Sequence, residues 1–260
     1  MHDPNRELVR KRLEALGFKV DLVQGVPNEK RPDLVASKDN STMFVEVKAR
    51  VEDTELRANM ESVGIGVTRS ILISLDKHNA LSTDVEKANT QLGAGAAPDD
   101  FRLLWFRVDN GPFVHDAREQ VGATLLGIRM VFTEYNAERR ARPCVYAGYA
   151  DFFRCREIDG AMIEVDGALT MILNQFSQRQ EAFARSPICA AVSPAIVDVQ
   201  RNTPEDLYYV IDDSDVNRKD EDALLAFLRT KYPMDTFLHF APHCAGTTVT
   251  TIDARLKRGV

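Results

Sequence analysis

Several features that would define a protein class are scarce or missing in this chain of 260 residues. Its four cysteines are spread out and include no C-x-x-C pair, which argues against a disulfide scaffold and a paired-cysteine zinc site. No apolar run approaches the length of a membrane span, and the polar first residues do not resemble a signal peptide. We therefore expect a cytoplasmic protein without a membrane partner. A glycine-rich phosphate loop, a dinucleotide-binding fingerprint and a Ser-His-Asp order are also missing.

An excess of positive charge is missing as well, since the formal net charge is −6. Residues 203–222 hold eight acidic and two basic residues, so this segment alone accounts for the −6 and the rest of the chain is neutral overall. We interpret it as a solvated loop and helix start; a partner-binding or DNA-mimicking surface is the alternative. Residues 1–50 carry ten Lys or Arg against eight Asp or Glu, which leaves room there for a basic surface that contacts nucleic acid.

The chemistry of the chain concentrates in a predicted β-hairpin. Asp33 opens an apolar run, a polar turn follows over residues 37–42, and the second predicted strand carries Glu46 and Lys48. Residues two apart in a strand share a face, so Glu46 and Lys48 lie together, and strand pairing allows Asp33 to approach them. Two carboxylates bind a hard cation such as Mg²⁺, and a lysine beside them can orient water and stabilise charge on a phosphate. A solvated Glu46–Lys48 pair on a half-exposed hairpin is the alternative, although Phe44 shares that face.

The sequence Pro32-Asp33, a spacer and then Glu46-Val47-Lys48 resembles the signature of the PD-(D/E)XK nuclease superfamily, which has the restriction-endonuclease-like fold. The order of predicted elements over residues 1–110 is similar to the core of that family. The order predicted for this chain is a helix at 3–17, a strand at 18–23, the hairpin, a helix at 82–92 and a strand at 101–108. A helix at about 53–63 and a strand at 71–73 are additional to that core.

The resemblance implies roles for individual residues. Asp33, Glu46 and the Val47 carbonyl would bind Mg²⁺, or Mn²⁺ in its place, and Lys48 would position the attacking water. Glu7 is a further candidate, because some nucleases of this kind add a carboxylate from the first helix to the metal site. An acidic residue that simply suits the dipole of the first helical turn is the other interpretation of Glu7.

The function that the resemblance implies is a Mg²⁺-dependent DNA endonuclease, and we favour a restriction-type enzyme. Enzymes of this type commonly act as homodimers. The alternative is a non-catalytic nucleic-acid-binding or assembly protein that keeps a nuclease-like fold.

The fold that we expect is α/β, with a restriction-endonuclease-like core (a mixed sheet flanked by helices) over residues 1–110 and an additional α/β C-terminal region over residues 111–260. We expect the second region to serve substrate recognition or oligomerisation. Glu164-Val165-Asp166 is interpreted as a strand end followed by a helix N-cap. The further elements expected are helices at 114–126, 167–184 and 221–231, and strands at 127–132, 143–149, 161–165, 195–199, 207–211, 237–240 and 247–252.

Overall fold

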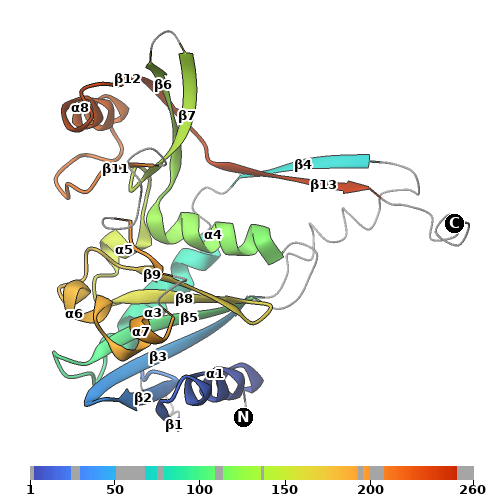
Figure 1. The fold of residues 1–260 in the computed structure, drawn as a ribbon, viewed down its shortest axis with the longest axis vertical. Coiled ribbons are helices and arrows are strands. Elements are labelled where there is room, and N and C mark those ends of the chain that lie inside the picture. The colour runs from blue at the N-terminus through green and yellow to red at the C-terminus, as the bar shows by residue number, and fades with distance from the viewer. Residues whose placement is uncertain are drawn as a thin grey trace, which may run out of the picture.

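The computed structural model of the chain describes residues 3–24, 30–50, 68–74, 79–108, 114–135, 138–192, 196–199 and 208–250. These residues form a mixed sheet flanked by helices and further α/β structure, which confirms the expected α/β class (Figure 1). The helix expected at about 53–63 lies outside the described residues. Within the described ranges, no helix is both long enough and apolar enough to cross a membrane.

Seven strands make up the main sheet, in the order β1-β2-β3-β5-β8-β9-β10. The first three form an antiparallel meander, β3, β5 and β8 are parallel, β9 is antiparallel to β8, and β10 is parallel to β9. The sheet therefore continues across residue 110, where we expected one region to end. The bounds are β1 Lys19–Leu22, β2 Leu34–Lys38, β3 Ser41–Arg50, β5 Phe101–Val108, β8 Gly160–Val165, β9 Ala168–Leu173 and β10 Ile196–Val197.

Helices cover both faces of this sheet. Helix α1 (Pro4–Ala15) packs on β1, β2 and β3 on one side, while α3 (Asn79–Gly93) and α4 (Val114–Leu126) lie on the other, as Figure 1 shows for α1 and α4. Asp3 caps the amino end of α1, and its side chain accepts a hydrogen bond from the Asn5 N–H.

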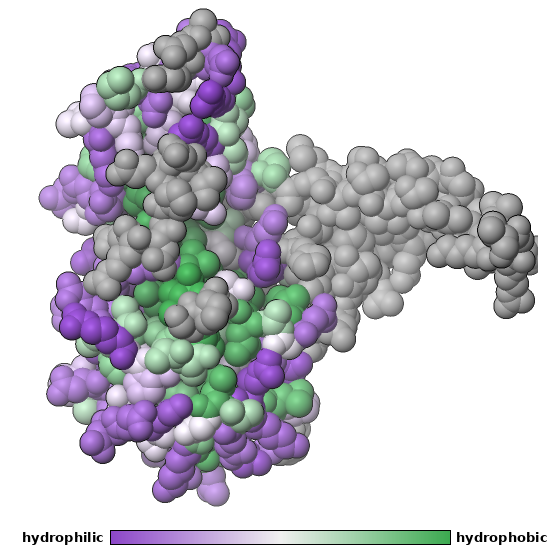
Figure 2. All heavy atoms as spheres, in the orientation of Figure 1, coloured by the Kyte–Doolittle hydropathy of each residue, from purple (hydrophilic) through white to green (hydrophobic). Residues whose placement is uncertain are grey.

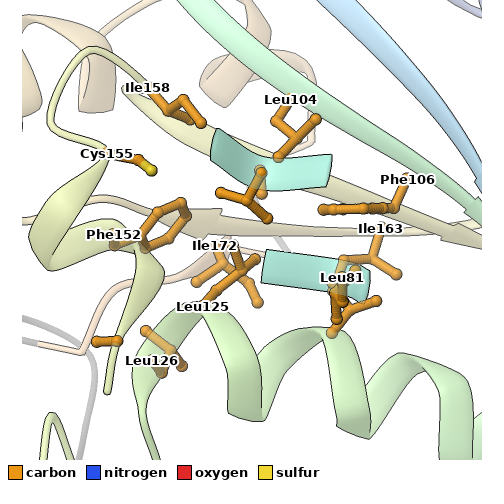
Figure 3. Packing of buried hydrophobic residues seen from close by; sticks show 14 of the residues in the cluster. Leu81, Leu104, Phe106, Leu125, Leu126, Phe152, Cys155, Ile158, Ile163 and Ile172 are labelled. Carbon is orange, nitrogen blue, oxygen red and sulfur yellow. The ribbon is translucent and has the colours of Figure 1, made fainter. Parts of the chain in front are cut away.

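Residues of the central strand β5 alternate between two hydrophobic cores, as the two-residue period of a strand requires. Leu103 and Trp105 join the core under α1, whereas Leu104 and Phe106 join the core under α3 and α4. Figure 3 shows Leu104 and Phe106 in the second of these cores, together with residues from both helices. These four side chains are fully buried, and β5 is the middle strand of the seven.

A second sheet follows in the chain, with the order β11-β7-β6-β12. Helix α8 (Glu221–Lys231) packs on β12 and shares a third core with this sheet. Asp220 caps α8, so the acidic segment does contain a helix start, as we expected. A separate two-stranded sheet pairs β4 with β13. The bounds are β6 Arg129–Tyr135, β7 Glu138–Val145, β11 Tyr209–Val210, β12 Thr236–Ala241, β4 Thr68–Ser74 and β13 Cys244–Thr250.

Hydrophilic and hydrophobic residues are unevenly distributed on the surface. In Figure 2, hydrophilic residues prevail at both ends of the described part of the visible face, and hydrophobic residues gather toward its middle, over the main sheet. Residues 151–191 also contain three short helices, namely α5 (Asp151–Arg154), α6 (Gln180–Ala184) and α7 (Pro187–Ala191).

The helix expected over residues 167–184 was wrong. The chain instead turns at Asp166 and Gly167, which both have positive φ (49° and 78°), and runs back as β9 against β8. Asp166 is therefore a hairpin residue and not a helix N-cap. The helical part of the range is confined to α6.

The strand expected at 143–149 is shifted as well, because β7 starts at Glu138 and ends at Val145. Tyr146, which follows it, has a left-handed backbone with φ of 61° that interrupts the extended chain. By contrast, the helices at 114–126 and 221–231 and the strand at 101–108 have the bounds that the sequence predicted.

Candidate active site

The candidate site lies at the open end of the hairpin formed by β2 and β3. Asp39 and Asn40, with φ of 50° and 60°, form the two-residue turn that joins the strands, as suits a right-twisted hairpin. Pairing is regular from Lys38 opposite Ser41 to Leu34 opposite Val45. This register brings the residues that precede β2 close to the second half of β3.

Asp33, directly before β2, bonds to β3 through both its backbone and its side chain. Its N–H donates to the Val45 carbonyl (3.0 Å), and its Oδ2 accepts from the Val47 N–H (2.8 Å). The carboxylate is thus held by a strand residue of the motif itself. Because the N–H and C=O of one strand residue point to the same side, the Val47 carbonyl also faces the side on which Asp33 lies.

Glu46 and Lys48 lie together on one face of β3, as their spacing predicts. The Lys48 ammonium donates to Glu46 Oε1 over 2.8 Å. Glu46 is 2% exposed, which excludes a solvated ion pair. Its second oxygen, Oε2, is buried and has no hydrogen-bond partner among the described residues, which is an unusual state for a buried polar atom.

The sequence did not reveal a fourth member of this cluster, Arg6 of α1. Its Nη2 lies 2.6 Å from Asp33 Oδ1, and Asp33 itself is only 3% exposed. Two cations, Arg6 and Lys48, therefore face two buried carboxylates. A signal for Arg6 did exist, because Arg6, Val9 and Leu13 follow the spacing of one helix face, and the last two are buried.

Burial and mutual repulsion make the two carboxylates harder to ionise. Burial raises the pKa of Glu46 to about 7, with the charge of Asp33 as the second cause, and the nearby Lys48 and Arg6 only partly offset this rise. Burial also raises the pKa of Asp33, although the Val47 N–H, Arg6 and Lys48 oppose it. A nearby divalent cation would favour the ionised form of both groups. Perturbed carboxyl groups beside a lysine are common at functional sites.

Glu7, the remaining candidate, is held along α1. Arg10 donates to both of its carboxylate oxygens, over 3.0 Å from Nε and 2.5 Å from Nη2, and also bonds Glu14 over 2.7 Å. The contact from α1 to Asp33 is made by Arg6, one position earlier. These contacts give Glu7 a local partner on its own helix.

The donor set of the site suits Mg²⁺ without forming a complete protein cage. Among the described residues, no group of three or more His, Cys, Asp or Glu could hold a metal ion. The available ligands are the carboxylates of Asp33 and Glu46 and the carbonyl of Val47. Mg²⁺ commonly keeps several waters and is bound through one or two carboxylates together with substrate phosphates, and the unpaired Oε2 of Glu46 is a suitable acceptor for it.

Comparisons with protein-family models, with curated proteins and with solved structures found no match to this chain. The likeness to PD-(D/E)XK nucleases therefore rests on the residues of the hairpin and on the order of the elements. Membership of that superfamily and the restriction-endonuclease-like core remain proposals.

Proposed function

We propose that this protein is a metal-dependent nuclease that hydrolyses phosphodiester bonds in DNA, built on a restriction-endonuclease-like core. The observation that carries the proposal is the cluster at β3, in which two carboxylates of 3% and 2% exposure lie with a lysine 2.8 Å from one of them. Burying two like charges costs stability. A purely structural hairpin has no use for two buried carboxylates, whereas a site that binds a cation and a phosphate requires them.

Each residue has a role that follows from its contacts. Asp33 is fixed by the Val47 N–H and would share the metal with Glu46 and the Val47 carbonyl. The bound Mg²⁺, with Mn²⁺ as a substitute, would supply Lewis-acid activation of water and stabilisation of charge on the phosphate. Lys48, held on the same face by Glu46, would orient the attacking water and stabilise the negative charge that develops.

The finer proposal is a cytoplasmic, restriction-type endonuclease that acts as a homodimer. Residues 111–260 contribute β8, β9 and β10 to the main sheet and also form the second sheet with α8. That leaves a substantial part of the molecule for substrate recognition or for contact with a second copy.

Cleavage of supercoiled plasmid DNA tests the proposal. The protein should nick or cut the plasmid with Mg²⁺ or Mn²⁺ and not with EDTA. Asp33→Asn should lower the rate by roughly 100-fold or more, because it removes a metal-binding charge. The amide oxygen of the new side chain can still accept from the Val47 N–H, so the hairpin keeps its bond. Asp21→Asn, at an exposed position of β1, is the matched control.

Two results would overturn the proposal. One is metal-dependent cutting by Asp33→Asn at the wild-type rate. The other is a wild-type protein that binds DNA but cuts neither DNA nor RNA with either metal, which would favour the non-catalytic nucleic-acid-binding protein.

A further inference from the structure

A polar groove runs along α3 beside the candidate site. It has a volume of about 250 Å³ and is lined by Lys30, Thr83, Glu86, Lys87, Thr90 and Gln91. The five lining residues of α3 follow the spacing of a single helix face. The opposite face of α3 carries Leu81, Val85, Ala88 and Leu92, which are buried in the core. The groove is thus formed by the polar face of an amphipathic helix and by the segment that leads to β2.

The groove and the site are on the same side of the main sheet. Gln91 Nε2 donates to the Arg31 carbonyl over 3.3 Å, two residues before Asp33. Phe44, which shares the strand face of Glu46 and Lys48, packs against the core that contains the buried residues of α3. The groove therefore borders the chain segment that leads to Asp33.

The lining of the groove favours a polyanion. All six lining residues carry a polar or charged group. The carboxylate of Glu86 is paired with Arg154 over 2.6 Å. Lys30 and Lys87, by contrast, form no ion pair with any residue in the described ranges. Within this part of the chain, the groove therefore presents two ammonium groups that lie outside ion pairs, and Gln91 keeps a second amide hydrogen to donate.

We infer that this groove binds the sugar–phosphate backbone of the substrate strand on one side of the bond to be cut, through Lys30 and Lys87. The inference rests on the proposed function and names a substrate-binding surface for it. Lysine binds phosphate as a point charge, and contacts of this kind fix the position of the nucleic acid without reading its sequence. The two lysines should accordingly contribute to affinity for any sequence.

The salt dependence of binding tests the inference directly. Fluorescence anisotropy would measure binding of a labelled duplex DNA in EDTA, between about 50 and about 200 mM salt, for wild type, Lys30→Ala, Lys87→Ala and the double variant. Each lysine removed should reduce the slope of log affinity against log salt by about 0.9, since one fewer counterion is released. Lys11→Ala, at an exposed position of α1, makes the same change in net charge and should leave the slope unchanged.

The outcome is separable from that of the cleavage experiment. Lysine variants that keep the wild-type slope, as Lys11→Ala should, would overturn the inference even if the protein cuts DNA. A wild-type protein that binds neither duplex DNA nor a single-stranded RNA of the same sequence would also overturn it. Reduced slopes in a protein that cuts nothing would support the groove and overturn the proposed function. Binding of the RNA alone, with a slope loss of about 0.7 per lysine, supports the groove and changes the substrate.

Discussion

Glu46 carries a carboxyl group into a part of the molecule with little access to water, and its ionisation is linked to stability. Its pKa rises from 4.5 to about 7 in the folded protein. Between these values the folded state binds more protons than the unfolded state, so the contribution of Glu46 to the free energy of unfolding falls as the pH rises. The total loss is about 3 kcal/mol, reached above pH 7.

Glu46→Gln should therefore weaken the pH dependence of the metal-free protein. The glutamine cannot ionise, so the variant should lose less stability than wild type between about pH 5 and about pH 8. Denaturant unfolding in EDTA at several pH values measures this difference. Glu119→Gln, at an exposed position of α4, should keep the wild-type profile. An unchanged profile in Glu46→Gln would show that Glu46 is ionised throughout this range.

Arg6 offers a second prediction at this scale, because it neutralises Asp33 where a metal would also bind. Arg6→Met keeps an apolar stem and removes the charge, which should cost about 1–2 kcal/mol of stability without metal, given that the Arg6 side chain is 37% exposed. Added Mg²⁺ should raise the melting temperature of the variant more than that of wild type, since the cation replaces the lost charge.

Thermal unfolding with and without Mg²⁺ measures the effect. Arg10→Met removes a charge from the same helix without affecting Asp33, so Mg²⁺ should change its melting temperature by the same amount as in wild type. An equal response in Arg6→Met and Arg10→Met would mean that Arg6 and the metal do not share a position.

The sequence was enough to predict the approach of Glu46 and Lys48, because the period of a strand is local. The contact of Asp33 with the Val47 N–H and the ion pair with Arg6 depend on how β2 begins and where α1 lies. Neither contact follows from the alternation of side chains along a single strand.

At the scale of elements, β9 shows where a periodic pattern misleads. Leu169, Ile172, Leu173, Phe176 and Phe183 fit a helical stripe, yet the first three lie in a strand. Residues 171–173 are buried in succession because β9 lies inside the sheet between β8 and β10. A continuous buried run cannot be distinguished from a buried helix by period alone. The useful signal was Asp-Gly between two apolar segments, which is typical of a two-residue hairpin.

Substitution of Gly167 should accordingly destabilise the protein more than substitution of a glycine in a helix. It has a φ of 78°, and Arg12 of α1 donates to its carbonyl. Gly167→Val should destabilise the protein by about 1–2 kcal/mol, because a branched residue is strained in the left-handed region. Gly122→Ala in α4 is the contrast, since its Cβ would make ordinary contact with Ile172 (3.9 Å) and alanine favours the helix. Denaturant unfolding compares them, and an equal or smaller loss in Gly167→Val would contradict the turn geometry.

At the scale of the whole molecule, the main sheet joins the two halves of the chain. Strand β5 pairs with β3 from the first half and with β8 from the second. Trp105, the one tryptophan of the sequence, is fully buried in β5 and donates from Nε1 to Glu164 of β8 over 3.0 Å. The environment of the Trp105 side chain therefore depends on the pairing of β5 with β8, that is, on the contact between the two halves of the chain.

A fragment of residues 1–110 should not fold by itself, because it lacks β8 and leaves the apolar residues of β5 exposed. Its tryptophan emission should resemble that of an unfolded chain, and its denaturation should lack a cooperative transition. The full chain should show a buried tryptophan signal that is lost cooperatively. A fragment with the buried signal and a sharp transition would instead establish residues 1–110 as an independent domain.

The central claim is that the cluster at β3 cleaves a phosphodiester bond, and Lys48 tests it most directly. The decisive measurement is the single-turnover rate of Mg²⁺-dependent DNA cleavage by wild type and Lys48→Met, each at a protein concentration that saturates the DNA. Methionine keeps the apolar stem and removes the ammonium group. We predict DNA and Mn²⁺ binding close to wild type and a cleavage rate lower by roughly 100-fold or more, because the lost charge acts on the transition state. Equal rates for the two proteins would contradict the account.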